Sequence, residues 1–143
     1  MQILAVDIGT GTQDILLYDS RVDIENSFKL VVPSPTMIVR SQLKQATQRK
    51  DPVLLKGYMM GGGPSLWAAE DHIKAGLAMY ATPDAARTFN DDLQAVKEMG
   101  VVIVSEEEAA RLSSRVTLVE FGDFDIKAIQ RAFDQFGISL NRL

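Results

Sequence analysis

The sequence predicts an α/β fold in which a mixed sheet, with three antiparallel strands followed by parallel strands, carries helices on both faces. The first three apolar segments are joined by short connections, which favour antiparallel pairing. The rest of the chain alternates helical and strand-like patterns, which is typical of a parallel sheet covered by helices. A length of 143 residues with 46% hydrophobic residues suits one domain, which we place over residues 1–143.

Six strands are expected, each a short apolar run bounded by glycine, proline or polar residues. They span residues 3–7, 13–18, 28–32, 53–59, 101–104 and 116–121. Residues 20–27 are polar and predict a loop. We expect all six strands in one sheet, with the first three antiparallel.

Five helices are expected between and after these strands, from apolar residues at helical spacing and from capping signals. They begin near Thr36, Ser65, Thr82, Ser105 and Asp125. Asp51-Pro52 ends the first, and the others end near Gly76, Gly100, Leu112 and Gly137. Ser65 and Thr82 are the predicted N-caps of their helices.

Composition excludes several classes of site. The chain has no cysteine, so within these residues it can hold neither a disulfide nor an iron–sulfur cluster. Its 15 basic and 19 acidic residues give a net charge of −4, which argues against a nucleic-acid surface. The apolar runs are too short to span a membrane, and the first strand begins too early for a signal peptide. We therefore expect a cytoplasmic protein without a membrane partner.

The first candidate site is the turn between the first two strands. Its glycines Gly9 and Gly11 let the backbone curl around an anion, while Thr10, Thr12 and the following Gln13 add polar groups. Asp7, at the end of the first strand, is the candidate metal ligand and catalytic carboxylate. Any tight hairpin also favours glycine, so a purely structural turn is the alternative.

The second candidate site is the run Gly61-Gly62-Gly63-Pro64-Ser65 between a strand and a helix. Backbone N–H groups of such a loop, together with the helix dipole, can bind an anion. A tight turn with Ser65 as N-cap is the alternative. We expect Gly11 and Gly62 to adopt conformations that are costly for residues with a Cβ atom. His72, the only histidine, is a possible accessory group, although a packed position is the more common outcome.

The order of these elements, opened by Asp7-Ile8-Gly9-Thr10, resembles the first lobe of the actin, heat-shock-70 and sugar-kinase superfamily, which has a ribonuclease-H-like fold. Residues 3–19 and 61–72 are together similar to a family of uncharacterised prokaryotic proteins that carries the label of a pyruvate formate-lyase activating enzyme. The superfamily resemblance implies that the opening motif is a phosphate loop, with magnesium and ATP as ligands. It also implies that a second lobe, or another copy of the chain, completes the site, while the sequence leaves open whether the natural protein continues past Leu143.

Two departures limit what the resemblance implies. Activating enzymes of that name hold an iron–sulfur cluster on cysteines, which this chain lacks, so radical chemistry is not expected. Sugar kinases place a basic residue shortly after the threonines, where this chain has Asp14. A carboxylate there repels a bare phosphate, so binding should require a divalent metal.

Three functions remain open from the sequence. The first is a phosphate-ligand or nucleotide-binding lobe that uses metal-assisted phosphoryl transfer if it is catalytic. The second is a ribonuclease-H-type nuclease in which Glu70 or Glu120 joins Asp7 at a two-metal site, which the net charge of −4 disfavours. The third is a non-catalytic binding domain, which Asp14 favours.

Overall fold

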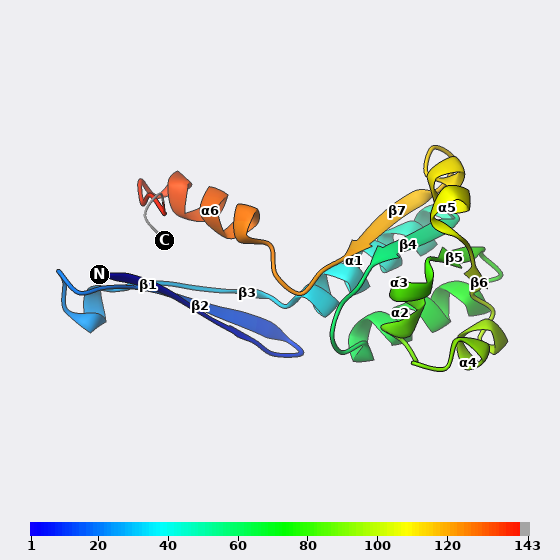
Figure 1. Cartoon of the computed structure of the whole chain (residues 1–143), viewed down its shortest axis with the longest axis horizontal. Coiled ribbons are helices and arrows are strands. Elements are labelled where there is room, and N and C mark those ends of the chain that lie inside the picture. Colours follow the sequence, from blue (N-terminus) through cyan, green and yellow to red (C-terminus); the bar gives the residue numbers. More distant parts are fainter. Residues whose placement is uncertain (141–143) are drawn as a thin grey trace. The chain divides into compact units, whose positions relative to one another are not determined.

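The computed structural model describes residues 1–140, and these residues form two compact units (Figure 1). One unit contains Met1–Ser34 and the residues from Phe124 onward, and the other contains Pro35–Asp123. We refer to them as the hairpin unit and the parallel unit and describe each by itself. The predicted single domain over residues 1–143 includes residues 141–143, which lie outside the described part.

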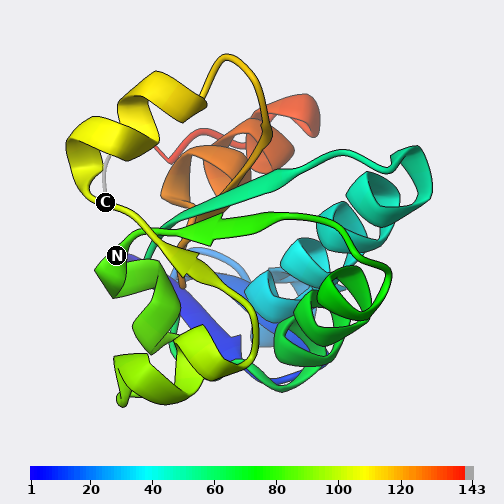
Figure 2. The same ribbon diagram turned by 90° about the vertical axis from the view of Figure 1, so that its right-hand side faces the viewer.

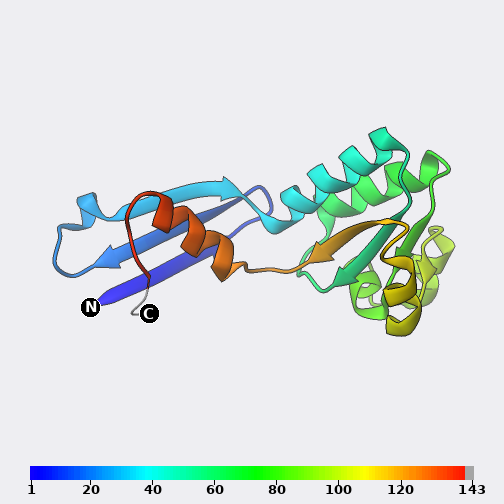
Figure 3. The same cartoon turned by 90° about the horizontal axis from the view of Figure 1, so that it is seen from above.

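The hairpin unit is a three-stranded antiparallel sheet with a helix on one face (Figure 3). Its elements are β1 (Gln2–Ile8), β2 (Thr12–Asp19), η1 (Ile24–Asn26), β3 (Phe28–Pro33) and α6 (Ile126–Gln135). Side chains of alternate strand residues pack against α6, where Phe133 is fully buried and meets Phe28 edge to face at 4.8 Å between ring centroids. The antiparallel pairing of the first three strands is confirmed.

The parallel unit is a four-stranded parallel sheet in the order β6-β5-β4-β7 (Figure 2). Its strands are β4 (Val53–Gly57), β5 (Met79–Ala81), β6 (Val102–Ile103) and β7 (Thr117–Phe121). Its helices are α1 (Pro35–Arg49), α2 (Gly63–Lys74), α3 (Pro83–Arg87), α4 (Leu93–Glu98) and α5 (Glu106–Leu112). Helix α6 belongs to the hairpin unit, although it follows β7 directly in the chain.

Helices cover both faces of the parallel sheet, as predicted. Val53 and Leu55 of β4 belong to the larger core, which includes side chains of α1, α2, α3 and α4. Leu54 faces the other way and packs with Ala109 of α5. A strand that is buried on both faces reads as a continuous apolar run, which is what Val53-Leu54-Leu55 shows.

The prediction of one continuous sheet is wrong, because the strands form two sheets. A strand has only two edges, and β4 uses both of them, one to pair with β5 and the other with β7. β1 pairs only with β2, so it stands at an edge of its own sheet. β4 pairs with β7 and not with β1. Both possible partners are far from β4 in the sequence, and the apolar pattern of a strand does not show with which distant strand it pairs.

One predicted helix is also wrong. The segment from Thr82 to Gly100 forms two short helices, α3 and α4, with a break between them. In the break, the N–H of Asp92 donates to Asn90 Oδ1, and the Asp92 side chain then caps α4 by accepting from Gln94 N. Asn and Asp side chains compete in this way with the helical hydrogen bonds of the backbone. By contrast, the predicted helix after Ser105 is confirmed and carries a complete capping box with Glu108.

Strand β5 is not among the six predicted strands, and it pairs with both β4 and β6 in the parallel unit. Within residues 1–140, no helix is both long enough and apolar enough to cross a membrane.

Candidate functional site

The hairpin turn, residues 8–12, is exposed, and two hydrogen bonds from Ser34 hold its backbone in place. The N–H of Ser34 donates to Gly11 O at 3.1 Å, and its hydroxyl donates to Thr10 O at 2.7 Å. Gly9 N donates to Thr12 O at 2.9 Å, which closes the turn itself. Three carbonyl oxygens are thereby turned toward protein donors. This arrangement favours an anion at the tip, because carbonyl oxygens pointing outward would repel it.

The glycines of this turn do not behave as expected. Gly11 has an ordinary φ, and a Cβ atom built on it would meet nothing within 4 Å. Gly9 also has an ordinary φ, and its Cβ would lie 3.3 Å from Thr12 O. The prediction of a costly conformation at Gly11 is therefore wrong. Gln13 does not face outward with the turn, since it is nearly buried and donates to Pro33 O at 3.0 Å.

Asp7 and Asp14 lie directly opposite each other in the β1–β2 register, and both are exposed. Opposite residues of an antiparallel pair have Cβ atoms about 4.5–5.5 Å apart, and like charges there repel each other. A divalent cation removes that repulsion, and magnesium prefers one or two carboxylates with waters and phosphate oxygens. The pair thus fits magnesium by its chemistry. Within residues 1–140, no group of three or more acidic, histidine or cysteine side chains gathers in a way that could hold a metal.

The second candidate, predicted over residues 61–65, lies where the chain leaves β4 and enters α2. We call residues 57–63, from the last residue of β4 to the first residue of α2, the glycine loop. In the order β6-β5-β4-β7, the chain crosses from β4 outward to β5 and β6 and then returns to the other side of β4 with β7. The connections therefore reverse direction between β4 and β7. In open α/β sheets, ligands bind outside the carboxyl ends of the strands at such a point. The glycine loop leaves the carboxyl end of β4 at this position.

Glycine is required at three places in the loop, either by a close backbone approach or by a left-handed φ. Gly57 has φ +83°, and a Cβ atom would lie 2.3 Å from Phe121 O on β7. Gly61 has φ +71°, a left-handed conformation with open space around it. Gly62 has an ordinary φ of −111°, so the predicted unusual conformation is wrong, but its Cβ would lie 2.8 Å from Thr88 O. Gly63 has an ordinary φ and open space.

Two side chains hold the loop in place, and the sequence did not single out either one for this role. Asp123, just after β7, accepts a hydrogen bond from Met60 N at 2.7 Å. Thr88, just after α3, accepts one from Met59 N at 3.2 Å. The N–H groups of Gly61, Gly62 and Gly63 have no such partner among the described residues. They are available to an anion at the start of α2.

Ser65 makes hydrogen bonds within the protein and is not exposed for ligand binding. Helix α2 begins three residues earlier than predicted, so that Gly62 and not Ser65 is the N-cap. Ser65 is fully buried, its N–H donates to Thr36 Oγ1 at 3.2 Å, and its hydroxyl donates to Gly62 O at 3.0 Å. These bonds tie the first turn of α2 to α1 and to its own N-cap.

His72 lies near the other end of α2, about 13 Å along the axis from Gly63. The ring is fully buried, with Nδ1 2.8 Å from Thr47 Oγ1 and Nε2 3.3 Å from Ala78 O. A neutral ring carries its proton on Nε2, because Ala78 O can only accept. Nδ1 then accepts from the Thr47 hydroxyl, whose other acceptor is Leu43 O at 2.8 Å. Burial lowers the pKa of His72, which keeps the ring neutral. Its contacts are those of a packed histidine.

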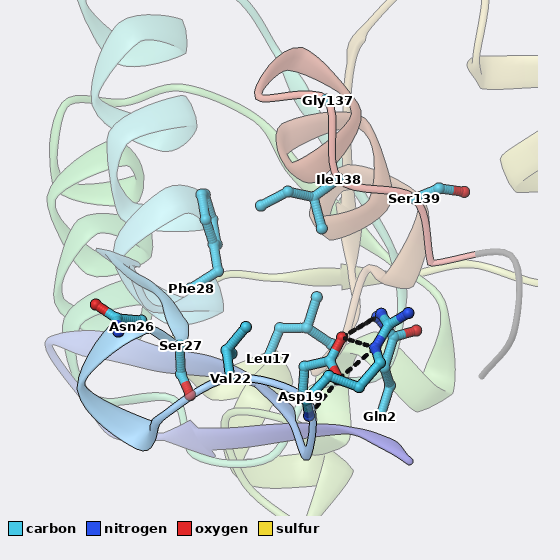
Figure 4. A pocket seen from close by; sticks show the side chains of 11 residues that line it. Gln2, Leu17, Asp19, Val22, Asn26, Ser27, Phe28, Gly137, Ile138 and Ser139 are labelled. Atoms are coloured by element: carbon cyan, nitrogen blue, oxygen red, sulfur yellow. Dashed lines mark hydrogen bonds and ion pairs between the residues drawn. The ribbon is translucent and has the colours of Figure 1, made fainter.

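A separate cavity of about 350 Å³ lies in the hairpin unit (Figure 4). Leu17, Phe28 and Ile138 supply apolar surface. Asp19 and Arg21, which also line the cavity, form an ion pair with each other. The guanidinium of Arg21 lowers the pKa of Asp19, so the pair stays charged on both sides and neutral overall. None of the residues predicted for a site lines this cavity.

The geometry therefore offers two turns suited to anions, one in each unit. Comparison with known proteins adds one finding: the model of a family described as "Putative pyruvate format-lyase activating enzyme (DUF1786)" matches residues 60–143. The matched part begins in the glycine loop and includes Asp123. No curated protein and no solved structure matches the chain.

Proposed function

The chain belongs to this family. We propose that it binds a small phosphate-bearing ligand at the glycine loop, where the matched part begins. The observation that carries the proposal is the position of the loop at the point between β4 and β7 where the connections reverse. Three N–H groups that have no hydrogen-bond partner within residues 1–140 lie there, at the start of a helix of 12 residues whose dipole favours an anion.

The activity in the family description is not part of our proposal. An activating enzyme of this name holds its iron–sulfur cluster on cysteines, and these residues include none. What the glycine loop offers is anion binding, and we restrict the proposal to that.

The charge around the glycine loop predicts that magnesium accompanies the ligand. Asp123 places a carboxylate beside the loop, bonded to Met60 N. A phosphate close to this carboxylate is repelled unless a cation lies between them. Magnesium commonly bridges one or two carboxylates and phosphate oxygens, so a magnesium-phosphate complex suits this site better than a bare phosphate.

The hairpin turn is the second candidate for the same kind of ligand. The bonds from Ser34 to Thr10 O and Gly11 O favour an anion at the tip, and Asp7 with Asp14 fits magnesium. If the ligand binds at the hairpin turn, the chain would resemble the first lobe of an actin-like protein in its site as well as in its fold. The antiparallel β1–β3 meander followed by α1 supports this resemblance, whereas the pairing of β4 with β7 does not. In such a lobe the ligand would be ATP and the chemistry metal-assisted phosphoryl transfer.

Two matched substitutions distinguish the sites. Gly63→Ala and Gly11→Ala each add a methyl group in open space at an ordinary φ, so both variants should fold like the parent. The binding of inorganic pyrophosphate in magnesium is measured by calorimetry on the full chain. We expect Gly63→Ala to weaken binding about tenfold, because the methyl group blocks close approach of the anion to the loop.

Gly11→Ala is the control and should bind as the parent does. Loss of binding in Gly11→Ala alone would move the site to the hairpin. No measurable binding to the parent, with or without magnesium, would refute the proposed function.

A further inference from the structure

Strand β1 forms one edge of the sheet of the hairpin unit (Figure 3), because among residues 1–140 it pairs with β2 alone. An edge strand presents a row of unpaired backbone N–H and C=O groups, to which a strand of another chain can add. Proteins commonly block such edges with lysine or other charged residues, with proline, or by keeping the edge strand very short. The side chains and the length of an edge strand therefore indicate whether it is open to pairing.

The other edge strands of the two sheets carry such features. β3 contains the exposed Lys29 and ends at Pro33, β7 contains the exposed Glu120, and β6 is only two residues long. β1 is seven residues long, has neither lysine, arginine nor proline, and carries its one charge, Asp7, next to its last residue. In the described part of the chain, β1 is therefore the edge strand with the least protection against pairing.

The register of the hairpin shows which backbone groups of β1 lie at this edge. In an antiparallel pair, residues that exchange hydrogen bonds with the partner strand alternate with residues that do not. Ser20 N donates to Met1 O at 3.0 Å and Gly9 N donates to Thr12 O at 2.9 Å, so the odd-numbered residues of β1 bond to β2. The N–H and C=O groups that point away from β2 are then those of Gln2, Leu4, Val6 and Ile8.

We propose that the edge of β1 binds the β1 strand of a second copy of this chain, in antiparallel orientation around a two-fold axis at Ala5. In this register the outward-pointing residues meet each other, with Gln2 opposite Ile8 of the second copy and Leu4 opposite Val6 of the second copy. Each such pair exchanges two hydrogen bonds, so the free backbone groups of β1 are all used. The two three-stranded sheets then form one sheet of six strands.

The side chains of β1 suit this register. Leu4 and Val6 are half-buried against the core that includes α6, and across the axis each gains the other as a neighbour on that face. On the opposite face, Asp7 lies opposite Ile3 of the second copy and not opposite another Asp7, so no like charges meet. A two-fold interface of this kind, which uses the same surface on both copies, is the most common one among homo-oligomers. The inference does not depend on the proposed function, because it uses no residue of the glycine loop.

Analytical ultracentrifugation of the full chain over a range of concentrations tests the proposal. We expect a reversible dimer, with twice the 15.7 kDa of one chain, that dissociates on dilution. Ala5 is exposed, so Ala5→Lys should leave the fold unchanged. The substitution places two like charges opposite each other at the axis and should raise the dissociation constant at least about tenfold.

A charge-reversed variant makes the test specific for the register. Ala5→Glu alone should weaken the dimer as Ala5→Lys does, whereas an equimolar mixture of the two variants should dimerise at least as well as the parent, because opposite charges then meet at the axis. Val31→Lys is the matched control. It adds the same charge on the same face of the sheet, at an exposed position of β3, and should dimerise as the parent does.

Hydrogen exchange of the backbone amides gives an independent readout. The amides of Leu4 and Val6 point to the free edge, so they should exchange slowly in the dimer and rapidly after dilution to the monomer. The amides of Ile3 and Ala5, which bond to β2, should stay protected at both concentrations.

The outcomes that overturn the proposal are equally definite. A chain that sediments as a monomer at every concentration refutes it, and so does a dimer that Ala5→Lys leaves intact. Slow exchange of Leu4 and Val6 in the monomer would mean that another part of the same chain occupies the edge, which also refutes it. If neither Ala5 variant folds, the exchange of Leu4 and Val6 in the parent decides between the dimer and an open edge.

Discussion

The hairpin turn and the glycine loop are both rich in glycine, yet the glycines do different things in the two places. In the hairpin, Gly11 has an ordinary φ and open space, so glycine is not required there. In the glycine loop, Gly57 and Gly62 allow backbone atoms of β7 and of the segment after α3 to approach closely. The comparison teaches that a run of glycines identifies a turn, whereas the neighbours of that turn decide whether glycine is needed.

The largest expected difference between the two turns is in stability. Gly57→Ala should lower the free energy of unfolding by about 3 kcal/mol or more, because it combines a left-handed φ with a Cβ atom 2.3 Å from Phe121 O. Gly11→Ala should change it by less than about 0.5 kcal/mol. Urea denaturation of both variants measures the contrast, and equal midpoints would show that the β4–β7 approach is not as close as described.

A smaller effect is expected at Gly62. Gly62→Ala places a Cβ atom 2.8 Å from Thr88 O. Because the φ of Gly62 is ordinary, only this close contact, and no backbone strain, lowers the stability. We expect a loss of about 1–2 kcal/mol in thermal or urea denaturation. Gly63→Ala, one residue further, is the matched control and should unfold as the parent does. A loss at Gly63 as large as that at Gly62 would contradict the assigned crowding.

The pH dependence of stability should come from the parallel unit, which contains the only histidine. Burial makes the pKa of His72 lower in the folded state than its ordinary value of 6.5, so the unfolded chain binds the proton more readily. Stability is then complete above pH 6.5 and falls as the pH decreases from there toward the lower, folded pKa. Urea denaturation at pH 7.5, 6.5 and 5.5 should show this loss.

The variant His72→Gln provides the control for that series, because it cannot titrate in this range. Its stability should change less than that of the parent between pH 7.5 and 5.5. Parallel behaviour of the two proteins would mean that the ring is not kept neutral by its surroundings.

The smallest expected effect is a change in the affinity for pyrophosphate, caused by the charge beside each turn. Asp123→Asn retains an oxygen that can accept from Met60 N and removes the negative charge beside the glycine loop. We expect pyrophosphate binding without magnesium to strengthen about two- to fivefold at low salt, and the gain to shrink as salt screens the charge. Asp14→Asn is the matched change at the hairpin. If it produces the gain and Asp123→Asn does not, the anion binds at the hairpin.

Local patterns predicted the local structure well. The alternation of apolar residues in β1, β2 and β3 and the capping box after Ser105 both lie within a few residues of the elements that they define. The break between α3 and α4 was also encoded locally, by Asn90 and Asp92, but helical spacing around them concealed it. The partition into two sheets depends on which strand pairs with β4, and no short segment carries that information.

In the candidate site, too, the sequence showed the residues with a local role and concealed those whose role depends on distant strand pairing. Gly61, Gly62 and Gly63 were visible as a run between a strand and a helix. Gly57 and Asp123 were not, because their roles depend on the parallel pairing of β4 with β7, which brings together residues far apart in the sequence. An aspartate two residues after the last predicted strand was the signal that could have pointed to Asp123, once β7 was placed beside β4.

The central claim, that phosphate binds at the glycine loop, is tested most directly by the backbone amides themselves. We suggest recording ¹H–¹⁵N correlation spectra of the assigned chain during titration with magnesium pyrophosphate. The account predicts that the amides of Gly61, Gly62 and Gly63 shift in a saturable manner, while those of Thr10, Gly11 and Thr12 move little. Saturable shifts confined to Thr10, Gly11 and Thr12, with the loop glycines unchanged, would contradict it.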